Sequence, residues 1–112
     1  MTFNESTADG TVFIRLNGDL IGESAGPAIL ERADRAIGEG NLHCIINISE
    51  VRYINSSGIG VLITLLTKFR NHGGELFLVN PSEHVNKLLI MTKLRNIFNI
   101  ADSENEAVEK IK

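Results

Sequence analysis

The sequence predicts one α/β domain, built on a mixed sheet of four to five strands with parallel central strands and about four helices. Two short apolar runs, residues 43–48 and Leu76–Val79, indicate strands that are covered on both faces. A helical pattern over residues 57–71 separates them, so that strand, helix and strand form a parallel crossover unit. The 112 residues suffice for a single domain, residues 1–112, without an internal repeat or linker.

A strand pair and a helix are expected before this unit. Residues 11–17 alternate apolar and polar side chains, which is typical of a half-buried strand, and a weaker edge strand around Phe3 is expected to pair with it across a tight turn. Gly26 and Pro27 then open a helix, because proline is tolerated at the first helical position. That helix is expected to end at Gly38.

Three elements are expected after the second central strand. Pro81 and Ser82 begin a helix, residues 97–100 form a short strand, and a capping box from Ser103 to Glu106 opens a last helix. The side chains of these two helices that are expected to face the core are Val85, Leu88, Leu89, Ala107, Val108 and Ile111.

The composition argues against nucleic acids and membranes as partners. Eleven basic and fourteen acidic residues give a net charge of −3, without the basic excess that binds nucleic acid or anionic lipid. The longest uncharged stretch, residues 53–67, is interrupted by polar side chains and is shorter than the ~20 apolar residues that span a bilayer. We therefore expect no membrane insertion. The first residues do not resemble a signal peptide, and the lone Cys44 indicates a reducing compartment, so we expect a cytoplasmic protein.

The sequence predicts neither an enzyme nor a metal or cofactor site. His43, His72 and His84 lie in separate elements and lack the paired spacing of a zinc site. Cys44 lies within an apolar strand and is expected to be inert core. No nucleophile, base and acid can be assembled into a catalytic arrangement.

The residues that point to a function lie where the first central strand meets the next helix, in the segment Asn55-Ser56-Ser57-Gly58-Ile59-Gly60. The N-terminus of a helix carries partial positive charge, so a phosphate on a serine here need not unfold the domain. The alternative interpretation is that Asn55, Ser56 or Ser57 only caps the helix. The glycines lack the remainder of a dinucleotide or P-loop motif, which favours close helix packing as their role.

This segment resembles the hallmark of the STAS domain of bacterial anti-sigma factor antagonists, Asp-Ser-Ser-Gly-hydrophobic-Gly between a strand and a helix. Four further matches are Asn17-Gly18-Asp19-Leu20, Gly73-Gly74-Glu75, Val85 through Leu89, and Met91-Thr92-Lys93-Leu94 followed by Ile97-Phe98. The resemblance covers nearly the whole chain, and it implies a single STAS-type domain.

The resemblance also implies a function by partner switching. The unmodified chain would bind an anti-sigma factor that is also a serine kinase of the histidine-kinase-like ATPase type, and would thereby release a sigma factor. That kinase would phosphorylate Ser56 to end the interaction, and a serine phosphatase would reset the cycle. Asn55, Ser57 and Gly58 would contact the partner. Asn55 stands where many members carry Asp, which removes one negative charge beside the serine while keeping a residue that caps helices.

Two questions stay open from the sequence. Val61 and Leu65 share one face of the predicted helix, where they either contact a partner or pack under a neighbouring helix. The side chains expected to turn inward from that helix are Ile59, Leu62, Ile63, Leu66 and Phe69. The second question is function: a constitutive STAS scaffold or transporter-associated adaptor, with Ser56 only a cap, is the main alternative. A nucleotide-binding or hydrolytic domain is less favoured, because the necessary Lys and metal-binding acids are missing.

Overall fold

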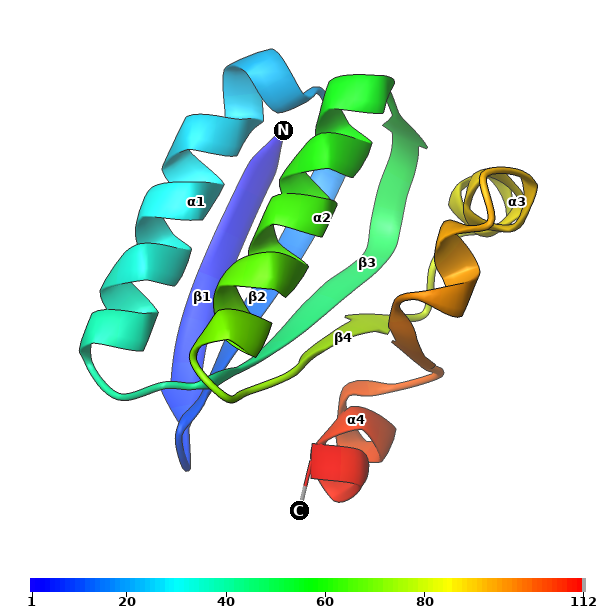
Figure 1. Ribbon diagram of the computed structural model, residues 1–112. Helices are drawn as coiled ribbons and strands as arrows, with labels where there is room; N and C mark the ends of the chain where they lie inside the picture. The colour runs from blue at the N-terminus through cyan, green and yellow to red at the C-terminus, as the bar shows by residue number, and fades with distance from the viewer. Residues whose placement is uncertain (112) are drawn as a thin grey trace.

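The computed structural model describes residues 1–111, which form a five-stranded sheet and four α-helices (Figure 1). The strands are β1 (Thr2–Ala8), β2 (Thr11–Leu20), β3 (His43–Ile54), β4 (Leu76–Val79) and β5 (Asn99–Ala101). The helices are α1 (Gly22–Gly38), α2 (Ser56–Asn71), α3 (Glu83–Met91) and α4 (Glu104–Ile111), with a 3-10 turn at Leu94–Asn96. The predicted α/β class with parallel central strands is confirmed.

The strands lie in the sheet in sequence order, β1-β2-β3-β4-β5. Only β1 and β2 are antiparallel, and the other three neighbouring pairs are parallel. Parallel neighbours require crossover connections, which α1, α2 and α3 provide in turn. All the parallel strands therefore end at the same edge of the sheet, where α1 and α2 begin (Figure 1).

The helices divide between the two faces of the sheet, because alternate strand residues point to opposite sides. The main core lies under α1, α2 and α3 and includes Ile14, Ile46 and Leu78 from the three central strands. A smaller core on the other face places Ile45 and Phe77 against α4. Since α4 is short, part of this second face stays uncovered.

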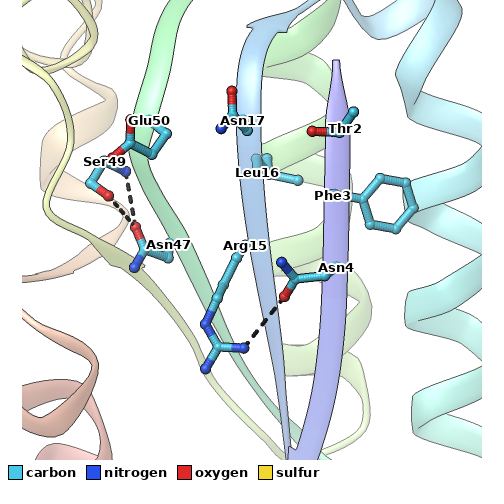
Figure 2. A pocket seen from close by; sticks show the side chains of 9 residues that line it. All are labelled: Thr2, Phe3, Asn4, Arg15, Leu16, Asn17, Asn47, Ser49 and Glu50. Atoms are coloured by element: carbon cyan, nitrogen blue, oxygen red, sulfur yellow. Dashed lines mark hydrogen bonds between the residues drawn. The ribbon is translucent and has the colours of Figure 1, made fainter.

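The uncovered part of the second face is a polar hollow of about 490 Å³ (Figure 2). Arg15 lies between Asn47 and Asn4 and contacts Asn4 of β1 at 3.5 Å, while Asn47 accepts hydrogen bonds from the backbone and hydroxyl of Ser49 (Figure 2). The Arg15 guanidinium also binds the carboxylate of Glu104. Two pairs of lining residues, Arg15 with Asn4 and Asn47 with Ser49, are therefore hydrogen-bonded to each other.

Several boundaries differ from the sequence prediction. Helix α1 begins at Gly22 rather than Gly26, because Ala25 N–H already donates to Ile21 O at 2.9 Å and Pro27 lies inside the helix. Strands β2 and β3 continue to Leu20 and Ile54, past their predicted ends, since their parallel pairing persists through two register shifts.

The last strand is Asn99–Ala101 rather than residues 97–100. The N–H groups of Ile97 and Phe98 both donate to Leu94 O, which extends the preceding turn and excludes these two residues from the sheet. The predicted capping box of α4 forms in part. Ser103 Oγ accepts from Glu106 N–H at 3.1 Å, while the Glu106 carboxylate accepts from Asp102 N–H.

Candidate functional site

The predicted motif lies at the sheet edge where α1 and α2 begin, and Asn55 joins the two helices there. Its backbone is extended and its side chain caps α2, with Oδ1 accepting from Gly58 N–H at 2.8 Å. The same oxygen accepts from Ser57 Oγ at 3.0 Å and from the N–H of Gly22, the first residue of α1, at 3.3 Å. One carboxamide oxygen therefore binds donors from the first turns of both helices.

Two glycines allow close backbone contacts here, Gly22 of α1 with the start of α2 and Gly58 of α2 with the end of β2. A Cβ on Gly22 would lie 2.3 Å from the carbonyl of Ser57, and a Cβ on Gly58 would lie 2.4 Å from Leu20 O. The close packing expected of Gly58 is confirmed. Gly60 differs, since nothing lies within 4 Å of a Cβ placed there. Gly58 is also buried, so its predicted contact with a partner is wrong and its role is internal.

The two serines differ in exposure and in hydrogen bonding. Ser56 is the first residue of α2 and is exposed, and its hydroxyl makes no hydrogen bond to any residue between 1 and 111. Ser57 is half-buried and donates to Asn55. The helix is thus capped by Asn55, which leaves the Ser56 hydroxyl accessible from solvent.

Glu23 completes the site from the first turn of α1. Asn55 Nδ2 donates to Glu23 Oε2 at 3.2 Å. The pKa of the Glu23 carboxyl is lowered, most by the nearby Ser57 hydroxyl and then by the backbone of its own turn and the Asn55 amide. Sequence reasoning missed Glu23, because it placed residue 23 before the helix. A glycine followed by an acid was the available signal for an earlier start.

Val61 and Leu65 belong to the core, which decides between the two alternatives left by the sequence. Val61 is 7% exposed and Leu65 is fully buried. A Cβ on Gly26 of α1 would lie 2.8 Å from Val61 Cγ2, so α1 packs directly on this face of α2. The assignment of Val61 and Leu65 as partner contacts is wrong.

Ile59 and Ile63, which the helical spacing turns inward, are half-buried and pack against the edge of the main core. Helix α2 contacts both α1 and the sheet, so its apolar side chains cover more than one stripe. The helical period alone does not show which stripe faces outward, because apolar residues surround most of the helix.

Cys44 and the three histidines lie in different environments. Cys44 is fully buried, and burial raises the pKa of its thiol. His72 and His84 are exposed, and His43 is half-buried with its Nδ1 accepting from Glu75 N–H. Among residues 1–111 no cluster of three or more metal-ligating side chains is found. None of the helices in that range combines the length and apolar character needed to span a bilayer.

Comparisons with known proteins identify the family to which this fold and sequence motif belong. Residues 3–107 match the model of the STAS domain. The chain is 32% identical over 79 residues to a candidate anti-sigma factor antagonist of Thermotoga maritima, with 70% of each chain covered. It is 26% identical over 103 residues to the anti-sigma F factor antagonist of Paenibacillus polymyxa, with 91% of this chain and 87% of that one covered.

Solved structures show the same fold. The anti-sigma factor antagonist SpoIIAA in its unphosphorylated form is 28% identical, with a TM-score of 0.83 and coverage of 98% of this chain and 96% of that one. The phosphorylated form of Bacillus SpoIIAA is 26% identical, with a TM-score of 0.77 and coverage of 99% and 100%. From its sequence match and its architecture, this chain belongs to the STAS domain family, among the relatives that are named anti-sigma factor antagonists.

Proposed function

We propose that this chain is an anti-sigma factor antagonist that is switched off by phosphorylation of Ser56. Unphosphorylated, it binds an anti-sigma factor that is also a serine kinase of the histidine-kinase-like ATPase type, and a sigma factor is released. Phosphorylation ends this interaction, and a serine phosphatase restores the binding form. The chain acts by binding and supplies no catalytic group, and the proposal places it in the cytoplasm.

The observation that carries the proposal is the division of roles between Asn55 and Ser56. A serine at the start of a helix is usually explained as a cap, but here Asn55 binds the free N–H of Gly58. Ser56 is exposed and its hydroxyl is not used by the fold. A kinase can therefore modify this hydroxyl without breaking a contact of the domain.

The effect of a phosphate on Ser56 is local. It adds about −1.5 to −2 charges at the positive end of α2, where the helix dipole favours an anion, so the fold tolerates it. A partner that docks flush against Ser57 and Asn55 would meet the bulk of the phosphate and would have to bury its charge. Burying an uncompensated charge costs on the order of several kcal/mol. The phosphate thus controls docking rather than folding.

The test is phosphorylation by a purified kinase. Each histidine-kinase-like serine kinase of the source organism is incubated with the chain and ATP, and mass spectrometry locates the phosphate. We expect one phosphate on Ser56 with one of these kinases. The variant S56A should bind that kinase permanently, S56D should bind poorly, and the control S57A should still be phosphorylated.

A different pattern would overturn the proposal. Equal binding of wild type, S56A and S56D would show a constitutive scaffold. Phosphorylation of Ser57 in place of Ser56 would show that the proposal assigns the switch to the wrong hydroxyl. If no kinase binds the unmodified chain, the antagonist function itself is wrong.

A further inference from the structure

Glu23 is an acidic side chain of α1 that contacts Asn55, the residue before the proposed switch, Ser56. It is the second residue of α1, and its carboxylate accepts from Asn55 Nδ2 at 3.2 Å. Asn55 directly precedes Ser56 in the chain. The Asn55–Glu23 pair therefore places a carboxylate beside the switch although the cap residue itself is neutral.

The carboxylate of Glu23 explains why an amide rather than an acid is suited to position 55. Asn55 Oδ1 is fixed by three donors, the N–H groups of Gly22 and Gly58 and the Ser57 hydroxyl. The other terminal atom of residue 55 must then face Glu23 Oε2. An amide nitrogen donates a hydrogen bond there, whereas an aspartate oxygen would place two carboxylate oxygens about 3 Å apart without a proton between them. The amide of Asn55 and the acid of Glu23 thus match each other.

The charge of Glu23 is also unbalanced, unlike its neighbours on the same helix. Glu31 pairs with Arg35 at 3.3 Å, and Asp34 pairs with Lys68 at 2.9 Å. Within the described residues, 1–111, no Lys, Arg or His lies within ion-pair distance of Glu23, which is exposed. One uncompensated negative charge therefore faces solvent beside Asn55, the residue that precedes Ser56.

We propose that Glu23 is a specificity-determining residue of the Ser56 site, presenting its carboxylate to a basic side chain of the docked partner. Asn55 holds that carboxylate in place and avoids the repulsion that an acid at the cap would cause. This inference rests on the proposed function, because it concerns the partner that binds the unphosphorylated chain. It assigns the acidic character of the site to α1 rather than to the start of α2.

Binding measurements on charge variants test the inference. The kinase that binds wild type is titrated in the presence of ADP, so that no phosphate is transferred, with E23Q and with the control E31Q. A charge pair separated by about 6 Å at an effective dielectric between 80 and 20 corresponds to roughly a three- to hundredfold change in affinity. We expect E23Q to lose affinity in this range and to bind with a weaker dependence on salt. E31Q removes the same charge from the same helix and should bind like wild type.

Relocating the carboxylate tests the pairing itself. In N55D the two acids face each other, so we expect a lower midpoint of urea unfolding and weaker binding. In E23Q/N55D the hydrogen bond is reversed, because the new amide at position 23 donates to the new carboxylate at position 55, and the negative charge returns to the site. The double variant should recover both the unfolding midpoint and most of the affinity that each single variant loses.

The ways in which the inference can fail are distinguishable. If wild type binds a kinase and S56D does not, but E23Q binds as wild type does, the role of Glu23 is wrong while the proposed function stands. If the effects of E23Q and N55D simply add in the double variant, the pairing is wrong. If wild type binds none of the kinases, the proposed function fails before Glu23 is tested.

Discussion

Arg15 of β2 holds Glu104, the first residue of α4, through two parallel hydrogen bonds of 2.9 and 2.8 Å. Asn47 of β3 adds a third bond to the same carboxylate, at 3.0 Å. The hydrogen bond from Arg15 is the largest influence on the Glu104 carboxyl, and it lowers the pKa of that group. These contacts join α4 to the polar half of the second sheet face, beside the smaller apolar core.

The substitution E104Q should therefore reduce stability in a pH-dependent way. Because the pKa of Glu104 is lower in the folded than in the unfolded chain, its contribution is complete above the unfolded value and is lost as pH falls through the folded one. The pair is partly exposed, so we expect a loss of about 1 kcal/mol at pH 7 that shrinks in acid. Urea unfolding of wild type and E104Q between pH 7 and pH 3 measures this difference. A constant gap across that range would contradict it, and E109Q on the exposed side of α4 is the control.

The glycines of the site should tolerate alanine to very different degrees. G22A and G58A place a Cβ within 2.3 Å of the Ser57 carbonyl and 2.4 Å of Leu20 O, so the backbone must shift at both positions, which we expect to cost about 1–3 kcal/mol or more. G60A adds a methyl group to open space inside α2 and should stabilise by about 0.5–1 kcal/mol. Thermal unfolding of the three variants separates these effects. Equal losses at all three positions would show that helix entropy, rather than close contact, governs them.

Removing the Asn55 side chain should cost more than removing an ordinary cap. N55A leaves the N–H groups of Gly22 and Gly58 without their acceptor. We therefore expect the free energy of unfolding to fall by about 2 kcal/mol, which is at the upper end of the range for replacing a helix-capping residue by alanine. S56A is the matched control, because it leaves every hydrogen bond of the site in place, and it should change stability by less than about 0.5 kcal/mol. Chemical denaturation compares the two. A large loss in S56A would mean that its hydroxyl supports the fold after all.

Leu65 should behave as a core residue. L65A removes a fully buried side chain between α2 and its neighbours, and we expect a loss of about 2–5 kcal/mol. The adjacent exposed position provides the control, since T64A should change the free energy of unfolding little. Urea unfolding measures both variants. A stable L65A that binds the kinase poorly would restore the discarded role of this residue in docking.

Local hydrophobic patterns predicted the architecture well. Two strands that are buried on both faces and separated by a helix can be connected in only a few ways, and a parallel crossover is the usual one. Local patterns also predicted Ser56 at the start of a helix. They failed where the answer depends on a distant segment. Nothing near Gly22 indicates that the backbone of Ser57 lies against it, and Pro27 suggested a later start for α1. The same limitation hid Glu23, whose contact with Asn55 exists only because two helix starts converge.

The position of Met1 has a practical consequence for experiments. A Cβ on Gly18, near the end of β2, would lie 3.3 Å from Met1 Cα, so Met1 lies at the same end of the molecule as Ser56, while α4 ends at the opposite side (Figure 1). An affinity tag or fluorophore attached ahead of β1 would crowd the face that carries Ser56, where the proposed kinase would dock. Fusions and surface immobilisation are better made behind α4, which leaves that face unobstructed.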